Sequence, residues 1–212
     1  MDGPAGAGKS TVARRVAAAL GLTFLDTGAM YRAVTLVVLE RGARPDDADA
    51  CAAVARALAL DFDGEGRIRI DGRPGEPEIR TPRVTRHVST VSAHPEVRAA
   101  IVARQRELGG HGRGVVAEGR DTTTVVFPHA DHKFFLTASP EERARRRAAE
   151  EGTPERADLI QLDIERRDRL DSQRAHSPLV RAPEAVLIDT DRLSVEETVA
   201  AILSAVRAGS GR

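Results

Sequence analysis

The sequence has few of the residues that mark secreted, membrane-spanning or base-stacking proteins. Its 212 residues include one cysteine, no tryptophan, five phenylalanines and one tyrosine. Because Cys51 has no second cysteine to pair with, an internal disulfide is excluded and a reducing, cytoplasmic compartment is expected. No apolar run of about 18 residues and no signal-peptide pattern is present, so we expect no membrane span. The scarcity of aromatic side chains disfavours the base stacking used by single-strand nucleic-acid binders.

The sequence also lacks net charge and has almost no lysine. Its 32 basic and 32 acidic residues cancel, so no global field would gather nucleic acid or an anionic membrane. Lysine occurs only at positions 9 and 133, and the other 30 basic residues are arginine. A typical arginine here therefore carries little functional information, whereas a lysine carries more. An arginine-rich nucleic-acid-binding module is disfavoured too, because residues 141–176 hold nine arginines and ten acids.

A phosphate-binding pattern opens the chain. Residues 3–10 read GPAGAGKS and match Gly-x-x-x-x-Gly-Lys-Ser/Thr, with one of the two lysines at the lysine position. Glycines let backbone N–H groups curl around a phosphate, Lys9 would reach the outer phosphates, and the Ser10 hydroxyl would ligate Mg²⁺. The alternative, a flexible glycine-rich tail, is disfavoured by the helical spacing of Val12, Val16 and Leu20. The residues expected to bind ATP are Gly3, Pro4, Ala5, Gly6, Ala7, Gly8, Lys9, Ser10 and Thr11.

The segments after the loop predict an α/β fold with a parallel central sheet. Short apolar strands are expected at 23–26, within 114–121, at 133–136 and at 185–189. Helices are expected over 11–20, 29–42, 46–60, 81–91 and 95–108, and after Ser194. Residues 60–80 alternate apolar and polar side chains around glycine turns, which predicts a hairpin subdomain. Residues 139–176 predict two helices joined at residues 152–154, a mobile lid.

One feature departs from the usual P-loop arrangement. Only Met1 and Asp2 precede the loop, whereas a P-loop is normally the turn between a buried strand and a helix. We therefore expect either that the native start codon lies upstream or that the chain was trimmed.

Polar residues after the predicted strands indicate a second ligand site, since ligands of open α/β sheets bind beyond the carboxyl ends of the strands. Three such segments are 26–28, 119–121 and 189–191. An ordinary surface pair is the alternative interpretation of Arg120 and Asp121. In the lid, one helix face is expected to carry Ile160, Ile164, Arg167, Asp171 and Arg174. Its charged end would either meet an anionic ligand or extend into solvent as an Arg–Asp pair.

Taken together, several segments resemble bacterial cytidylate kinases, a family of P-loop nucleoside monophosphate kinases. They are GPAGAGKST, LDTGAMYRAV, GEPEIRTPRVTRHVSTVSAHPEVR, AEGRDTTTVVFPHADHKFFLTAS, ERRDRLDSQRAHSPL and LIDT, and they cover nearly the whole chain. The resemblance implies a three-layer P-loop fold with a core of 1–40, 95–138 and 178–207, a monophosphate-binding insertion at about 41–94 and a short helical lid at about 139–177. It implies that ATP, with Mg²⁺, phosphorylates CMP and dCMP in pyrimidine nucleotide metabolism, in a monomer.

The resemblance also implies roles for individual residues. Those expected to hold the acceptor phosphate are Arg32, Arg120 and Arg174. Those expected to read the cytosine are Ser89, Arg98 and Asp121, and those expected to bind the sugar are Arg167 and Asp171. Thr27, which follows a strand, is expected to line the same site. Lys9 would act on the transferring phosphoryl group from one side, and Arg146, Arg147 and Arg167 would close from the lid. The sequence departs from some members by carrying Ser10 where they have glycine.

Two alternatives carry less support. Another small-molecule P-loop kinase, acting for example on a sugar acid or on shikimate, would have no reason to carry the GRD and IR-T-P-V segments together. A regulatory nucleotide switch would be expected to carry an Asn-Lys-x-Asp guanine-reading motif, which the sequence lacks.

Overall fold

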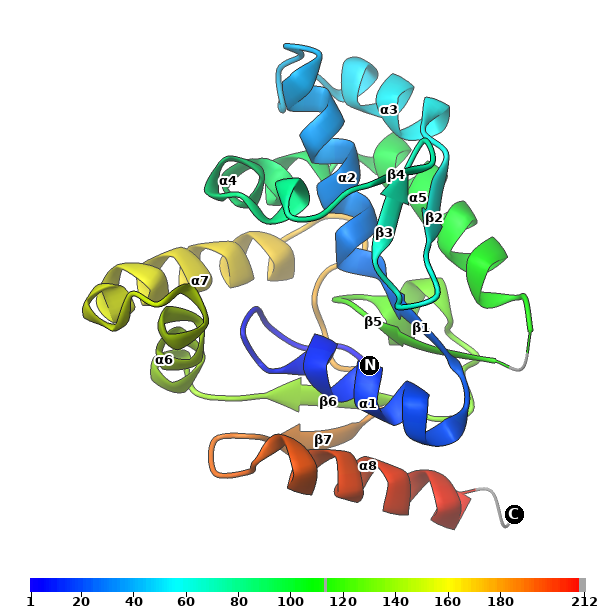
Figure 1. The fold of residues 1–212 in the computed structure, drawn as a ribbon, viewed down its shortest axis with the longest axis vertical. Coiled ribbons are helices and arrows are strands. Elements are labelled where there is room, and N and C mark those ends of the chain that lie inside the picture. Colours follow the sequence, from blue (N-terminus) through cyan, green and yellow to red (C-terminus); the bar gives the residue numbers. More distant parts are fainter. Residues whose placement is uncertain (113, 210–212) are drawn as a thin grey trace. The chain divides into compact units, whose positions relative to one another are not determined.

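The structure is a computed structural model that describes residues 1–112 and 114–209. The chain divides into two compact units (Figure 1). The P-loop unit consists of Met1–Leu22 and Glu118–Arg212, and the second unit of Thr23–Ala117. The predicted lid lies within the P-loop unit, and the predicted insertion lies within the second unit.

Parallel strands and their covering helices form the P-loop unit. Strand β6 (Phe134–Thr137) pairs in parallel with β7 (Val186–Asp189). Asp2 forms parallel bridges to Gly119 and Phe135, so it lies at the place of a central strand. Helix α1 (Lys9–Leu20) packs against α8 (Val195–Gly209). The parallel strands confirm the α/β class predicted from the short apolar runs.

A short π-helical segment, η2 (Thr122–Val126), follows the Gly119-Arg120-Asp121 turn, and the sequence did not predict it. The Asp2 carboxylate accepts hydrogen bonds from the backbone N–H groups of Thr122 and Thr123 and from both hydroxyls, at 2.6 to 2.9 Å. This buried carboxylate therefore fixes the backbone that directly follows Asp121.

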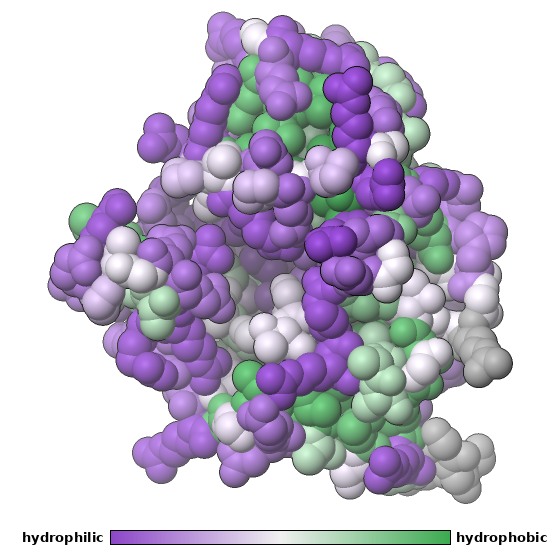
Figure 2. Space-filling model, viewed as in Figure 1, coloured by the Kyte–Doolittle hydropathy of each residue, from purple (hydrophilic) through white to green (hydrophobic). Residues whose placement is uncertain are grey.

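The lid is a pair of helices, as predicted, α6 (Pro140–Glu151) and α7 (Ala157–Ser172), joined through the short turn η3 (Pro154–Arg156). The Ser139 hydroxyl accepts from the Glu142 N–H at 3.3 Å, and Gly152 ends α6 in the left-handed conformation. Because α7 ends at Ser172, Arg174 lies beyond the helix, and the prediction that it shares the helix face was wrong. Figure 2 shows a mostly hydrophilic surface over this pair.

Four helices and a small sheet make up most of the second unit. The helices are α2 (Thr27–Glu40), α3 (Ala48–Ala57), α4 (Pro82–Val91) and α5 (Pro95–Gly109), with a short turn η1 (Glu78–Arg80) before α4. The predicted hairpin is a three-stranded antiparallel sheet of β2 (Leu60–Phe62), β3 (Ile68–Ile70) and β4 (Arg73–Pro74). Strand β1 (Thr23–Asp26) is hydrogen-bonded to β5 (Val115–Glu118).

Helix α2 organises the core of the second unit, because it packs against α3 and α4 while α3 packs against α5. Its side chains Met30, Val34 and Val38 are fully buried. Asp26 caps α2 by accepting from the Ala29 N–H at 2.8 Å, which places Thr27 in the first turn. None of the described helices is both long and apolar enough to cross a membrane.

Candidate active site

The P-loop winds tightly ahead of α1. Gly3, Gly6 and Gly8 have φ values of 149°, 77° and 78°, which side-chain-bearing residues rarely adopt. A Cβ on Gly3 would lie 2.0 Å from the carbonyl oxygen of Leu136, so the loop begins directly against β6. Gly8 precedes α1 and has no side chain with which to cap it. The first N–H groups of α1 are therefore left for an anion, at the end of the helix where its dipole favours one.

Lys9 is buried beside this loop. The residue is 5% exposed, and its ammonium donates to the carbonyl oxygen of Pro4 at 2.7 Å. Burial, followed by the nearby charge of Arg120, lowers the pKa of Lys9 to about 7, although the charges of Glu118 and Asp168 act in the opposite direction. A phosphate next to this ammonium would favour its charged form.

The Ser10 hydroxyl lies where a metal-bound phosphate is expected. Its Oγ donates to Oε1 of Glu118 at 2.7 Å, and Glu118 is 5% exposed at the end of β5. A hydroxyl and a carboxylate are the oxygen donors that Mg²⁺ prefers, so these residues fit the ion. The described part of the chain contains no group of three or more His, Cys, Asp and Glu side chains that could hold a metal. Glu118 is not among the site residues expected from the sequence.

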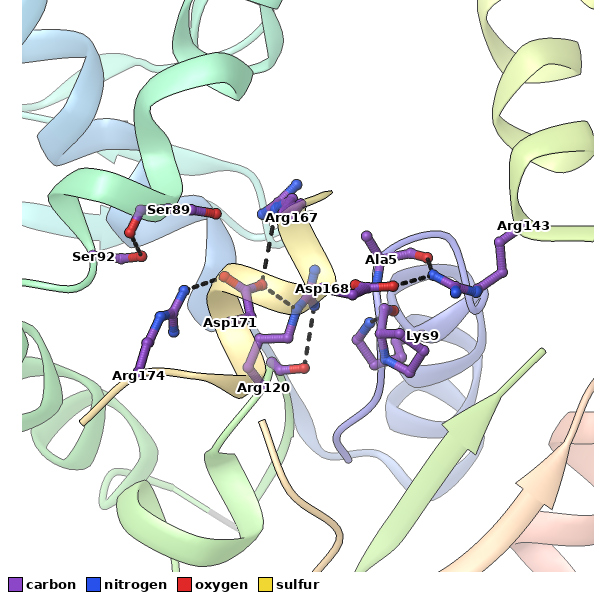
Figure 3. A network of polar contacts seen from close by, with 12 residues as sticks. Ala5, Lys9, Ser89, Ser92, Arg120, Arg143, Arg167, Asp168, Asp171 and Arg174 are labelled. Carbon is purple, nitrogen blue, oxygen red and sulfur yellow. Dashed lines mark hydrogen bonds and ion pairs between the residues drawn. The ribbon is translucent and has the colours of Figure 1, made fainter. Parts of the chain in front are cut away.

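Three arginines converge on Asp171, whose side chain is 1% exposed (Figure 3). The Arg120 Nε lies 3.0 Å from Oδ2 of Asp171, Arg174 donates to Oδ1, and the Arg167 Nε lies 4.0 Å from Oδ2. Burial opposes ionisation of Asp171, but the charge of Arg120, helped by Arg174 and Arg167, holds its pKa below the usual value. The structure thus brings four of the predicted residues together.

This cluster carries more positive than negative charge. Burial, followed by the repulsion of Arg120, lowers the pKa of Arg167 to about 10. Within the described residues, the buried Nε of Arg167 has no hydrogen-bond partner. A phosphate would relieve the repulsion among the guanidinium groups and supply acceptors for their N–H groups. Asp121, 4% exposed, directly follows Arg120 in the chain.

The lid arginines divide into two kinds. Arg146 donates to Glu142 at 2.8 Å and to the hydroxyl of Thr190 at 3.0 Å, and Arg147 donates to Glu151 at 2.7 Å. In this structure neither of these two predicted catalytic arginines makes a hydrogen bond to the P-loop. Arg143 does: its guanidinium donates to the carbonyl oxygen of Ala5 at 2.9 Å and to the carboxylate of Asp168. Neither Arg143 nor Asp168 is among the site residues expected from the sequence.

The second unit holds the remaining predicted residues. Arg32, 8% exposed, donates from Nη1 to the carbonyl oxygen of Ile79 at 3.2 Å and to the Thr85 hydroxyl at 2.8 Å. The Arg32 side chain of α2 is thus held by the segment that contains the IR-T-P-V residues.

Ser89 and Arg98 are linked through Ser92. The Arg98 Nη1 donates to the carbonyl oxygen of Ser92 at 3.2 Å, and the Ser92 hydroxyl donates to the carbonyl oxygen of Ser89 at 3.3 Å. The guanidinium of Arg98 also lies over the ring of Tyr31, 5.1 Å from its centre. Two of the three residues expected to read the base therefore belong to one buried polar group at α4 and α5.

Comparisons with known proteins agree on one family. The model of the cytidylate kinase family matches residues 1–208. The chain is 49% identical over 210 residues to the cytidylate kinase of Caldanaerobacter subterraneus subsp. tengcongensis, covering 98% of this chain and 93% of that protein. It is 48% identical over 205 residues to the cytidylate kinase of Nocardia farcinica, covering 94% and 88%. It is also 50% identical over 211 residues to a bifunctional pantoate ligase/cytidylate kinase of a Synechococcus species, covering 95% of this chain but 43% of that longer protein. The chain therefore belongs to the cytidylate kinase family.

Proposed function

We propose that this chain transfers the γ-phosphoryl group of ATP to the phosphate of CMP or dCMP, with the residue roles set out below. The family membership supports the reaction. The observation that supports the roles best is the proximity of Lys9, from the P-loop, to the buried cations of the Asp171 cluster, close enough for the charge of Arg120 to lower the pKa of Lys9. The P-loop unit thus carries a cation suited to the phosphates of the donor, Lys9, and cations suited to the phosphate of the acceptor, the arginines around Asp171.

The donor side consists of P-loop residues. The N–H groups at the start of α1 and the Lys9 ammonium would bind the outer phosphates of ATP. Mg²⁺, when bound by the Ser10 hydroxyl with Glu118 beside it, would neutralise charge on those phosphates. Lys9 would hold the γ-phosphoryl group in line with the acceptor, because positioning and charge neutralisation are the main demands of a loose transition state.

The acceptor side needs no general base, because the attacking phosphate oxygen is already anionic. Arg120 and Arg174 would bind that phosphate from the P-loop unit, and Arg32 would bind it from α2. Arg167 and Asp171 would bind the sugar. Arg167, with Arg146 and Arg147 after a rearrangement of their side chains, would stabilise the transferring group; an arginine in this role contributes about 10³ to 10⁵ in rate in P-loop enzymes.

The choice of base would follow from hydrogen-bond donors and acceptors. The Asp121 carboxylate would accept from the amino group of cytosine, whereas uracil presents a carbonyl there and would leave two acceptors facing each other. Ser89 and Arg98 would contact the remaining polar edge of the base. A monomeric state, a cytoplasmic location and the domain boundaries remain predictions.

A coupled assay of ATP consumption against a panel of nucleoside monophosphates, shikimate and sugar acids tests the proposal. We expect turnover with CMP and dCMP far above that with UMP. Equal rates with CMP and UMP would refute the base-reading roles, and turnover of a sugar acid alone would favour the other small-molecule kinase. Asp121→Asn is expected to relax the preference for CMP over UMP. The exposed Asp131→Asn, in the same unit, serves as the matched control and should leave the ratio unchanged.

A further inference from the structure

Both backbone polar groups of one P-loop residue are held by side chains of the lid helices. The N–H of Ala5 donates to Oδ1 of Asp168 on α7 at 3.0 Å, and its carbonyl oxygen accepts from Nη1 of Arg143 on α6 at 2.9 Å. Arg143 also donates to Oδ2 of Asp168 and, through Nε, to the carbonyl oxygen of Ala138 at 3.0 Å. Ala5, Arg143 and Asp168 thus form a closed ring of hydrogen bonds (Figure 3).

The next P-loop residue touches the backbone of α6. A Cβ placed on Gly6 would lie 3.0 Å from the Cβ of Arg143 and 3.2 Å from its carbonyl oxygen. The absence of a side chain at position 6 therefore permits the close approach of the loop to the helix, in addition to the positive φ that this glycine adopts.

Apolar packing joins the same three segments. Ala5, Ala144 of α6 and Ile164 of α7 form one buried cluster, with Ile160 packed against it. The Arg143 and Asp168 side chains are 7% and 17% exposed, so their ion pair is largely withdrawn from solvent. Hydrogen bonds, close backbone approach and apolar contact thus all dock the P-loop on the lid helices.

Asp168 lies close in sequence to residues of the arginine cluster on α7. Arg167 precedes it, and Asp171, the centre of the arginine cluster, lies three residues later. One helix therefore holds the phosphate-donor loop through Asp168 and carries residues assigned to the acceptor.

We propose that Arg143 and Asp168 are positioning residues that fix Ala5 and Gly6 against α6 and α7, and so set the register between the ATP-binding loop and the acceptor-binding residues of α7. The inference rests on the proposed function for the identity of the acceptor, whereas the docking of the P-loop on the lid helices is independent of that function. Neither residue is assigned a contact with substrate, since their hydrogen bonds are made to Ala5, to Ala138 and to each other.

The test compares Asp168→Ala, Arg143→Met and the double variant with the wild-type enzyme. The exposed Asp163→Ala on the same helix is the matched control; Asp163 is 80% exposed and lies 3.7 Å from Arg166. Three quantities are measured: the hydrogen-exchange rate of the Ala5 amide by NMR, the affinity for ATP with Mg²⁺ in the absence of acceptor, and the separate KM values for ATP and CMP. The first two do not require that CMP be the acceptor, so failure of the proposed function and failure of this inference are distinguishable.

We expect exchange of the Ala5 amide to rise by about tenfold in Asp168→Ala, because a hydrogen bond to a charged group is lost. We expect ATP affinity to fall by a similar factor and kcat to fall, while the KM for CMP changes little. The double variant should resemble either single variant, because the three groups act as one ring. Asp163→Ala should match the wild type.

Unchanged Ala5 exchange and unchanged ATP affinity in a folded Asp168→Ala protein would overturn the inference. So would faster exchange throughout the P-loop unit with parallel rises in both KM values, which is the pattern of general destabilisation. Should Asp168→Ala not fold, Asp168→Asn decides the question, because its Oδ1 can still accept from Ala5 while the attraction to Arg143 is lost. Its ATP affinity should then fall by less than that of Arg143→Met, and a larger fall would contradict the proposed ring.

Discussion

Replacing Asp171 by asparagine is the most direct probe of the arginine cluster. The carboxylate is 1% exposed, and it is the common partner of Arg120, at 3.0 Å, and of Arg174. Asparagine has almost the same shape, so the packing is retained while the charge is removed. The guanidinium groups of Arg120, Arg167 and Arg174 would then repel one another in a largely buried place, without their shared counterion.

The expected cost follows from the burial of the groups. Removing one partner of a buried ion pair destabilises a protein by about 3–5 kcal/mol. The Arg120 side chain is 16% exposed and that of Arg174 is 7% exposed, so solvent screens them little. The Arg167 Nε, at 4.0 Å, contributes less. Since asparagine still accepts one hydrogen bond, we expect a loss near the lower end, about 3 kcal/mol of unfolding free energy.

The dependence of this loss on pH has a definite sign. The pKa of Asp171 is lower in the folded protein than its usual value, so its stabilising contribution is complete above the unfolded pKa and is lost as pH falls through the folded pKa. The difference between wild type and Asp171→Asn should therefore be constant from about pH 8 to about pH 5 and should shrink only at more acidic pH.

Urea unfolding monitored by circular dichroism measures the difference, with Asp163→Asn as the exposed control on the same helix. Added inorganic phosphate should stabilise Asp171→Asn more than the wild type, because the anion replaces the missing counterion. A loss below about 1 kcal/mol, the range of exposed pairs, would refute the view that Asp171 is the buried counterion of this cluster.

Two further predictions concern one residue in each unit. The pKa of Lys9 is lowered to about 7 in the nucleotide-free protein and should rise when ATP phosphates bind, so above that pH ATP binding takes up a proton and ATP affinity falls as pH rises. Calorimetry in two buffers of different ionisation enthalpy detects this uptake, and heats that do not depend on the buffer would contradict it. Arg32→Met should raise the KM for CMP by about tenfold to a hundredfold with little change in the KM for ATP, because a charge-assisted contact to phosphate is lost. Steady-state kinetics with each substrate varied in turn measures both values, and equal rises in the two would argue for a structural role of Arg32.

The elements of the fold were readable from local chemistry. The apolar runs at β1, β6 and β7, and the helices expected after Ser139 and Ser194, correspond to elements that the structure contains. The hairpin at residues 60–80 was recognised from its turns, but its third strand was not, because two residues, Arg73–Pro74, carry no readable alternation. The π-helical turn after Asp121 had no local signal either, since the buried carboxylate of Asp2, 120 residues away along the chain, holds it in place.

The candidate site was readable wherever a motif or a strand end marked it. Lys9 and Ser10 follow from the P-loop pattern, and Arg120 follows from its place after a strand. Glu118 is the last residue of that strand, two residues before Arg120, but no motif marks it. Its contact with Ser10 joins positions 108 residues apart, which spacing along the chain does not reveal.

Arg143 shows where helix periodicity stops being informative. Ala144 and Ala148 mark the buried face of α6, and Arg143 and Arg145 flank Ala144 at about 100° on either side. Helical periodicity alone predicts similar burial for these two arginines. The side chain of Arg143 is nevertheless 7% exposed, whereas that of Arg145 is 70% exposed. The difference arises because the loop at Ala5 and Gly6 meets the first turn of α6, on the side of Arg143. Tertiary packing decides which turn of a helix contacts a loop that is distant in sequence. In a chain with thirty arginines, the arginine that holds the P-loop could therefore be identified only from the structure.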